Sequence, residues 1–261
     1  MLDTHTHILW NIDDGSKNQC MSLQMLEIAA RSGTKAIFAT PHVIERANKP
    51  SWEEIKEKTQ QLRQLCAEAQ IDIMLYPGAE VQMNWELLPE LGATGAYCLN
   101  GGRYLLVELP AAEIPAYADE FWYELELKGI TPILAHPESY QQLRENPDLL
   151  LLWRRRGMLM QCNSGSFTGM FGSSVCENAK VLLANGLVDL LGSDGHRSEG
   201  RNTDMSRAAA VIRQLAGEEV LRQLTETNPQ AILKNQEIEL KQPKVLLEDK
   251  PKSFWQKLFG K

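Results

Sequence analysis

The first residues of the chain carry a pattern that could bind metal ions. Asp3, His5 and His7 occupy alternate positions in a segment that is too short for more than one β-strand. Alternate side chains of a strand share one face, so the two imidazoles project together with the carboxylate close by. Imidazole nitrogens and carboxylate oxygens are common ligands of divalent transition metals. The start of the chain therefore indicates part of a metal site.

The remaining histidines strengthen this interpretation. The chain has five histidines, and those outside the first segment are His42, His136 and His196. Each follows an apolar run bounded by Gly or Pro, and Glu80 ends a further run of this kind. Such runs are typical of buried parallel strands, and barrel enzymes carry their chemistry at the carboxyl ends of these strands. A lone buried histidine is usually structural, but this shared placement favours one metal site.

The order of apolar runs and amphipathic segments predicts the fold class. We expect an α/β fold, a distorted TIM-like barrel of seven parallel strands with helices between them, and the 261 residues suit one such domain. The predicted strands are residues 1–7, 35–40, 71–77, 104–109, 130–135, 158–162 and 189–192. The predicted helices are one that starts at a Ser16/Gln19 capping box and ends at Gly33, one that starts at Ser51 and Glu54, and residues 116–128, 147–156, 175–185 and 205–216.

The end of the chain differs in composition from the rest. We expect residues 1–235 to form the metal-binding domain and residues 236–261 to form a charged tail with a short amphipathic end. The apolar side chains of that end would share one face of a helix flanked by lysines. They are Phe254, Trp255, Leu258 and Phe259. This end either packs on its own barrel, has no fixed partner, or docks weakly on a membrane surface or a membrane-bound partner.

The composition argues against several classes of protein. Lys and Arg number 27 against 34 Asp and Glu, and the net charge of −7 disfavours nucleic acid as the main partner. The five cysteines form no Cys-x-x-Cys pair, as expected for free thiols in a reducing cytosol. We find no signal peptide and no apolar run of membrane-spanning length. We therefore expect a cytoplasmic enzyme, with a position at the inner face of the membrane as an alternative that depends on the tail.

The expected ligand set indicates both the metal and the chemistry. Several histidines with carboxylates that can bridge ions fit Mn, Fe or Zn better than Mg or Ca. A hydroxide held between such ions attacks phosphorus near neutral pH, and the ions neutralise the anionic transition state. Hydrolysis of a phosphate ester uses both effects. A cysteine-dependent phosphatase is disfavoured, because Cys98 and Arg103 are one residue too close together to enclose a phosphate-binding loop.

Five motifs, in this order, resemble the polymerase and histidinol phosphatase (PHP) superfamily, and within it the capsule-type, manganese-dependent bacterial protein tyrosine phosphatases. The motifs are Asp3-x-His5-x-His7, Thr40-Pro41-His42, Gly78-Ala79-Glu80, Ala135-His136-Pro137-Glu138 and Ser193-Asp194-x-His196. The turn Asp13-Asp14-Gly15 adds to the match. The similarity extends from Met1 to about Leu233.

The resemblance implies a PHP fold with two or three bound ions, most readily Mn²⁺, with Fe or Zn as alternatives. It implies metal ligands at Asp3, His5, His7, Asp14, His42, Glu80, His136, Asp194 and His196. A first ion would be bound by His5, His7, Glu80 and Asp194. Glu80 would bridge to a second ion at His42 and His136. A third would lie near Asp14 and His196, with Asp3 either a ligand or an orienting group.

The resemblance also implies catalytic roles for Arg201, Asp194 and His196. Arg201 would bind the phosphate, and Arg197 is a second candidate. The family commonly has Arg where this chain has Ser139, so Arg197 or Arg144 would have to replace that contact.

The substrate implied by the resemblance is phosphotyrosine on a protein. The protein would be a membrane-bound tyrosine autokinase that regulates capsule or exopolysaccharide export. Two alternatives remain open. One is a phosphoesterase for histidinol phosphate or another small molecule, and the other is a non-catalytic metal-bound module that recruits a partner.

Overall fold

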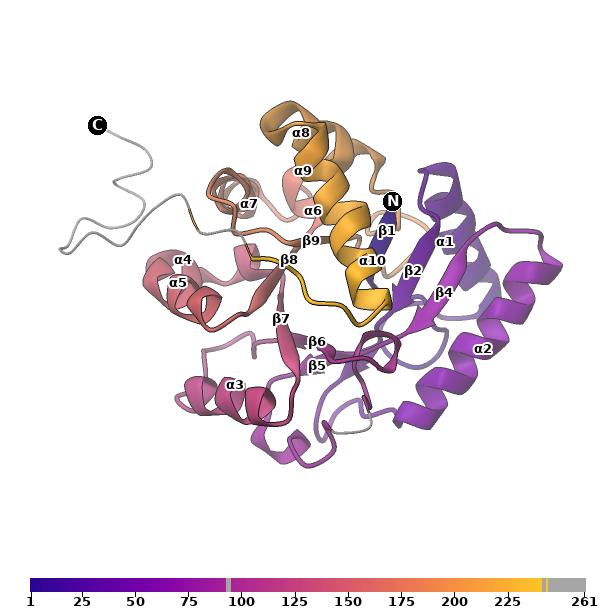
Figure 1. The fold of residues 1–261 in the computed structure, drawn as a ribbon. Helices are drawn as coiled ribbons and strands as arrows, with labels where there is room; N and C mark the ends of the chain where they lie inside the picture. The colour runs from indigo at the N-terminus through magenta and orange to yellow at the C-terminus, as the bar shows by residue number, and fades with distance from the viewer. Residues whose placement is uncertain (93–94, 241–242, 244–261) are drawn as a thin grey trace.

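Parallel β-strands form the centre of the molecule, and helices surround them (Figure 1). The structure is a computed structural model that describes residues 1–92, 95–240 and 243. The described strands pair in the orders β1-β2-β4 and β3-β5-β6-β7-β8-β9, and neighbours run parallel throughout. Their bounds are β1 Leu2–Thr6, β2 Ala36–Ala39, β3 His42–Val43, β4 Met74–Pro77, β5 Glu80–Gln82, β6 Tyr104–Glu108, β7 Thr131–Ala135, β8 Leu159–Asn163 and β9 Leu190–Gly192.

Two of the predicted strands continue, after a short break, in additional short strands. All seven predicted strands are present, but β2 is followed by the short strand β3 and β4 by the short strand β5, which the sequence did not predict. Pro41 separates the first pair and Gly78 with Ala79 the second, since proline lacks a ladder donor and glycine weakens a strand. Backbone bonds from Gly78 to Ala39 and from Glu80 to Pro41, of 2.9 and 3.0 Å, continue the pairing across the interruptions. The two sheets therefore form one bent, nearly continuous sheet.

Hydrogen bonds between the first and last strands close this sheet into a barrel. The backbone N–H of Asp194 donates to the carbonyl of His5 at 2.8 Å, and that of His7 donates to the carbonyl of Gly195 at 2.9 Å. The Thr4 hydroxyl donates to the carbonyl of Leu191 at 3.0 Å. The predicted distorted α/β barrel is confirmed, and β1 lies beside the end of β9 (Figure 1).

The helices agree with the sequence prediction except at their ends and in the short connecting helices. Their bounds are α1 Gln19–Arg31, α2 Trp52–Glu68, α3 Ala118–Leu127, α4 Gln141–Glu145, α5 Pro147–Arg155, α6 Ser164–Phe167, α7 Ser173–Ala184, α8 Ser206–Ala216, α9 Glu218–Arg222 and α10 Asn228–Leu233. A π-helical turn, Gln223–Thr227, joins α9 to α10.

One of the two predicted capping boxes is wrong. The side chain of Asn18, not Ser16, caps α1 by accepting a bond from the backbone N–H of Met21. Ser16 is buried and its hydroxyl donates to the Asn18 carbonyl. At α2 the prediction is confirmed, because Ser51 accepts from the backbone N–H of Glu54 at 3.1 Å. Gly33, with a φ of +88°, lies just after the end of α1 as expected.

Alternating side chains of the strands build two layers of core. Along β6, Leu105 and Val107 pack outward against the helices, whereas Leu106 packs inside the barrel with Phe38 of β2 and Ile133 of β7. These interior side chains are almost completely buried. The interior is thus apolar below the carboxyl ends of the strands, where the polar side chains gather.

The segment after α10 returns along the barrel. Ile238 is buried in the interior core, and the Tyr104 hydroxyl donates to the carbonyl of Gln236 at 2.6 Å. Residues 236–240, which the sequence assigned to the tail, therefore contact the strands at their amino ends. The predicted amphipathic end, Phe254, Trp255, Leu258 and Phe259, lies outside the described residues. Within the described part of the chain, no helix is long and apolar enough to cross a membrane.

Candidate metal centre

The two histidines of the first motif meet at the carboxyl end of β1. The Nε2 atoms of His5 and His7 lie 3.1 Å apart, and both side chains are fully buried. Glu80 Oε2 lies 3.2 Å from the first of these atoms and 3.3 Å from the second. Asp194 Oδ1 approaches the same nitrogens at 3.6 and 3.4 Å. The four side chains predicted to bind a first ion therefore converge on one point.

Glu80 also contacts the next two histidines, one through each oxygen. His42 Nδ1 lies 3.0 Å from Oε2, and His136 Nε2 lies 2.9 Å from Oε1. Glu108, at the end of β6, approaches His42 Nδ1 at 3.4 Å. A carboxylate shared in this way has the geometry of a bridging ligand. The sequence prediction missed Glu108, although it is a carboxylate at the end of an apolar strand.

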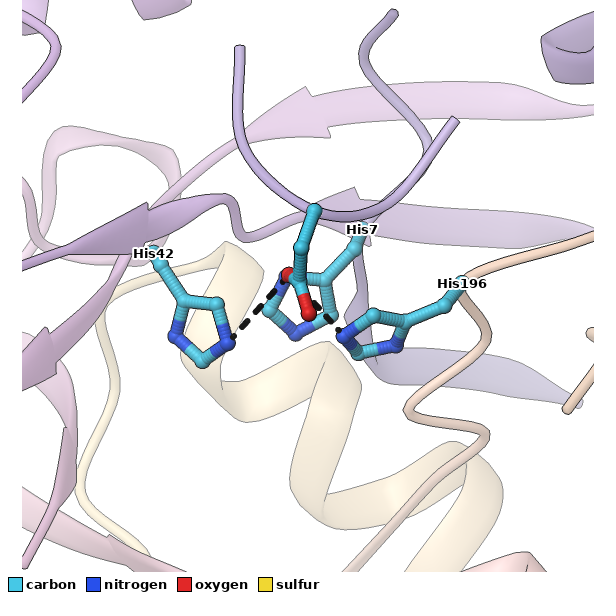
Figure 2. Close-up of side chains that lie close together, drawn as sticks. His7, His42 and His196 are labelled. Carbon is cyan, nitrogen blue, oxygen red and sulfur yellow. Dashed lines mark ion pairs between the residues drawn. The ribbon is translucent and has the colours of Figure 1, made fainter. Parts of the chain in front are cut away.

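A further group of donors lies nearer the surface. The rings of His7, His42 and His196 face a common centre (Figure 2). Asp14, whose side chain is 65% exposed, brings Oδ1 to 3.4 Å from His196 Nε2 and 3.7 Å from His42 Nε2. One ligand atom from each of these residues lies within 4.8 Å of the others. The residues predicted around a third ion are thus close together.

The donors fit divalent ions. His42 Nδ1, Asp194 Oδ1 and His196 Nε2 are buried atoms that have ion-pair contacts but no hydrogen bond among the described residues. Buried polar atoms usually have a hydrogen bond or another ligand, and a bound ion would supply one to all three. Mixed imidazole and carboxylate donors suit Mn, Fe or Zn.

Asp3 has a different position from the other predicted ligands. It is fully buried, and Oδ1 accepts bonds from the backbone N–H groups of His5 and Ser193, at 3.2 and 2.8 Å. Burial raises the pKa of its carboxyl group to about 6. Asp3 lies outside the three ligand groups found among the described residues, as His136 and Asp194 also do, and its Oδ2 is buried without a hydrogen bond there. Its contacts favour the orienting role, since they join β1 to the segment that carries Asp194.

Three side chains orient the ligands, and the sequence prediction missed all of them. Asp13 Oδ2 lies 2.7 Å from His7 Nδ1, and Gln161 Oε1 lies 2.9 Å from His5 Nδ1. The Asn163 amide donates to Asp194 Oδ2. Such contacts fix ring orientation and tautomer. The signals in the sequence were weak. Asp13 stands beside Asp14, Gln161 lies within a predicted apolar strand, and Asn163 directly follows that strand.

Two of the predicted ligands have a strained backbone. His136 has a φ of 36° and Asp194 a φ of 52°, in the left-handed region that costs non-glycine residues of order 1–3 kcal/mol. His136 directly follows β7 and Asp194 lies two residues after β9, where the chain turns to direct their side chains at the cluster. Strain at these two positions supports a functional site.

The carboxylates and imidazoles change each other's protonation. Burial alone would raise the pKa of Glu80, but His5 and His42 hold it well below its usual range. Burial and His7 would lower the pKa of His42, but Glu80 and Glu108 raise it to about 10. The cluster therefore favours positive charge, and metal ions would displace protons on binding.

The pKa of His196 shifts in the opposite direction from that of His42. Burial, and then the neighbouring His7, lower its pKa to about 3. Its imidazole is thus neutral near pH 7, which is the form that binds metals.

The predicted phosphate-binding residues differ in their surroundings. The Arg201 guanidinium pairs with Asp194 and lies 5.5 Å from the centre of the Phe171 ring, with 38% of the side chain exposed. Arg197 is exposed in the same loop, and Arg144 lies half-buried in α4. Arg201 is therefore held at the centre while part of it remains accessible.

A cavity of about 490 Å³ opens beside the cluster. His136, Glu108 and Ser139 line it, together with the buried Tyr140, whose hydroxyl accepts a bond from the backbone N–H of Leu109 at 2.9 Å. Ser139, at the position where Arg was expected, faces this space with a small neutral side chain. This space therefore lies next to two of the ligand candidates, His136 and Glu108.

The fold and the centre define the class of protein: an α/β barrel with a histidine- and carboxylate-rich site for divalent ions at the carboxyl ends of its strands. The chain belongs to the capsular polysaccharide synthesis family CpsB/CapC, whose model matches residues 1–234. The predicted resemblance is thereby confirmed.

Relatives of known activity cover most of the chain. The tyrosine-protein phosphatase YwqE of Bacillus subtilis is 34% identical over 238 residues, which are 91% of this chain and 93% of the relative. The tyrosine-protein phosphatase CpsB of Streptococcus pneumoniae is 28% identical over 241 residues, covering 90% and 99%.

Solved structures with similar folds include metal-dependent phosphatases. One from a study of YwqE and CpsB as "unique metal-dependent tyrosine phosphatases" matches with a TM-score of 0.88 at 32% identity, covering 95% of this chain and 100% of that chain. A histidinol phosphate phosphatase from Lactococcus lactis shares the fold, with a TM-score of 0.53 at 16% identity, covering 82% and 93%.

Proposed function

We propose that this protein is a metal-dependent phosphatase that hydrolyses phosphotyrosine in proteins. The convergence of His5, His7 and His42 on Glu80 carries the proposal, because it gathers ligands for more than one divalent ion in a member of the CpsB/CapC family. The activity of YwqE and CpsB supports phosphotyrosine as the substrate.

The geometry supports the following ligand roles. His5, His7, Asp194 and Glu80 would hold one ion, and His42 and His136 would share Glu80 around a second. Asp14 and His196 would bind a third, and Glu108 joins His42 and Glu80 as a further ligand candidate. Divalent ions bound there supply an activated water and positive charge for phosphoryl transfer.

Two arginines remain for the phosphate. Arg201 would donate to the phosphate while its pairing with Asp194 and its contact with Phe171 keep it in place. The exposed Arg197 would contribute less, because no described contact orients it. The cavity beside His136 supports a large leaving group such as the tyrosyl ring.

We further propose Mn²⁺ as the ion in use, with Fe or Zn able to replace it, since the donors mix imidazole with carboxylate. The substrate protein would be a membrane-bound tyrosine autokinase that controls polysaccharide export, as the family's link to capsule synthesis suggests. The protein would then act in the cytoplasm, at the inner face of the membrane.

One experiment separates this function from its alternatives. Metal-stripped protein is reconstituted with Mn²⁺, and kcat/KM is measured on a phosphotyrosine peptide, a phosphoserine peptide and histidinol phosphate. We expect a clear preference for phosphotyrosine, abolished by a chelator and unaffected by thiol alkylation. Preference for histidinol phosphate would assign a small-molecule phosphatase, and retained metal without turnover of any substrate would favour the binding module.

A further inference from the structure

A second cavity lies at the opposite end of the barrel from the metal centre. It has a volume of about 690 Å³, within the range of small-molecule sites, and is formed at the amino ends of β6, β7 and β8. The helices α3 and α5 and the segment after α10 complete it. Figure 1 shows that segment, in yellow, passing by the end of β8. The proposed phosphatase chemistry makes no use of this cavity.

Three aromatic side chains border it, each with very little exposed surface. Trp122 of α3 and Trp153 of α5 are nearly fully buried, with ring centroids 5.5 Å apart at an interplanar angle of 70°. Tyr104 lies at the start of β6, and its ring is 5.3 Å from the guanidinium carbon of Arg103. Such a lining favours a flat apolar ligand, because rings bury large apolar area and stack.

Two buried donors in this lining have no acceptor among the described residues: the indole N–H of Trp122 and Nε of Arg103. The neighbouring tryptophan provides the contrast, since Trp153 donates its indole N–H to Asp119 at 2.8 Å. A buried donor without an acceptor is unfavourable, so an acceptor group on a ligand would be stabilised here.

The charges around the cavity limit what that acceptor can be. Arg103 forms no ion pair with a carboxylate among the described residues, whereas Arg156 lies 3.8 Å from Asp119. A single anionic group would therefore find a guanidinium that no carboxylate of the described residues neutralises. The exposed carboxylates Glu126, Glu237 and Glu239 also line the cavity and would repel a ligand with several negative charges.

We propose that this cavity binds a small aromatic molecule with one anionic group, with the ring against Trp122 and Tyr104 and the anion at Arg103. The site is separate from the metal centre. A polyphosphate or a nucleotide is excluded by the carboxylates, and an uncharged aromatic compound leaves the Arg103 donor unpaired.

The test uses two fluorescent probes with the same rings. Anilinonaphthalene sulfonate carries one negative charge, and N-phenylnaphthylamine is its uncharged counterpart. Metal-loaded, full-length protein is titrated with each. We expect saturable binding of one molecule per chain, with the sulfonate bound about tenfold more tightly, the scale of one charge-assisted bond. Inorganic phosphate should not displace it.

Variants locate the probe. Arg103→Gln should remove the tenfold preference, and Trp122→Phe, which keeps an aromatic ring of smaller size and removes the N–H, should weaken sulfonate binding several-fold. Arg31→Gln, at an exposed arginine paired with Glu27, is the matched control and should change nothing. Thermal unfolding of each variant checks that it folds.

Several results would overturn the proposal. They are equal affinity for the two probes, an unchanged preference in Arg103→Gln, and displacement by phosphate, which would place the probe at the metal centre. Binding that occurs only after removal of residues 244–261 would assign the cavity to the chain's own end instead.

Discussion

The Nδ1 atom of His7 lies 2.7 Å from Oδ2 of Asp13, which leaves Nε2 of His7 to face His5, Glu80 and Asp194. The same Asp13 oxygen accepts a bond from the backbone N–H of His42 at 3.0 Å. One carboxylate thus sets the orientation of a ring from β1 and the start of β3. Carboxylates that hold a ligating histidine in this way raise its affinity for the metal.

We therefore expect Asp13→Asn to weaken Mn²⁺ binding by about tenfold to a hundredfold while the protein remains folded. Titration calorimetry of the metal-stripped variant measures the effect. Asp72→Asn, at an exposed carboxylate paired with Lys35, is the control. Equal affinity in the two variants would contradict the positioning role of Asp13.

Glu80 is the carboxylate with the most histidine neighbours. Glu80→Gln keeps the size of the side chain but removes the charge that faces His5, His7 and His42. We expect it to lower bound Mn²⁺ and to reduce kcat by more than about a hundredfold, because the proposed bridging ligand is lost. Elemental analysis and phosphate release are measured together. Glu57→Gln, on the exposed face of α2, should keep both.

Substitution of Arg201 should reduce the activity more than substitution of Arg197. Arg201→Ala is expected to lower kcat/KM by about tenfold or more, the scale of a lost charge-assisted bond to phosphate. Arg197→Ala should have a smaller effect, since Arg197 is exposed and Arg201 is held by Asp194 and Phe171. Steady-state kinetics at saturating Mn²⁺ separates them, and equal losses would show that Arg201 has no special role.

Metal removal should destabilise the fold. Ions that bind only the native state at about 100 times their Kd add about 2.7 kcal/mol, which corresponds to a rise in Tm of roughly 5–10 °C for a chain of this size. We expect a chelator to lower Tm by that amount. The Glu80→Gln variant should show a smaller change, and an equal drop in both would mean that the ions stabilise some other region.

A buried ion pair offers a test of stability away from the centre. Arg154 and Asp189 pair with side chains only 2% and 6% exposed. Arg154→Leu leaves the Asp189 charge buried, so the free energy of unfolding should fall by about 3–5 kcal/mol. Lys35→Ala, which breaks an exposed pair, should cost less than about 1 kcal/mol. Urea unfolding measures both, and a similar cost would refute the burial argument.

The strands and most of the predicted ligand positions could be read from the sequence for one reason. A buried parallel strand is a short apolar run, and a polar side chain that ends it must lie at the carboxyl edge of the barrel. His136 follows this rule directly, whereas His42 and Glu80 come shortly after β2 and β4 and begin the short strands β3 and β5. Glu108 follows it too, but one acidic residue among 34 Asp and Glu is a weak signal without its neighbours in space.

The contacts that orient the ligands could not be predicted, because they depend on packing between distant segments. Gln161 reaches His5 across 156 positions of sequence, and its residue type alone gives no partner. The cap of α1 was misplaced for a local reason. Ser16 and Asn18 are both good capping residues, and burial of Ser16 against Ser22 decides between them.

The division of the strands into two sheets gives the centre a mechanical role. β1 belongs to the first sheet and supplies His5, whereas His42 and Glu80 lie on β3 and β5 of the second. Ions bound among them would connect the two sheets at the breaks between β2 and β3 and between β4 and β5. Backbone amides of β2 and β4 should therefore exchange with solvent more slowly once metal is bound, so that the catalytic ions also act as cross-links of the barrel.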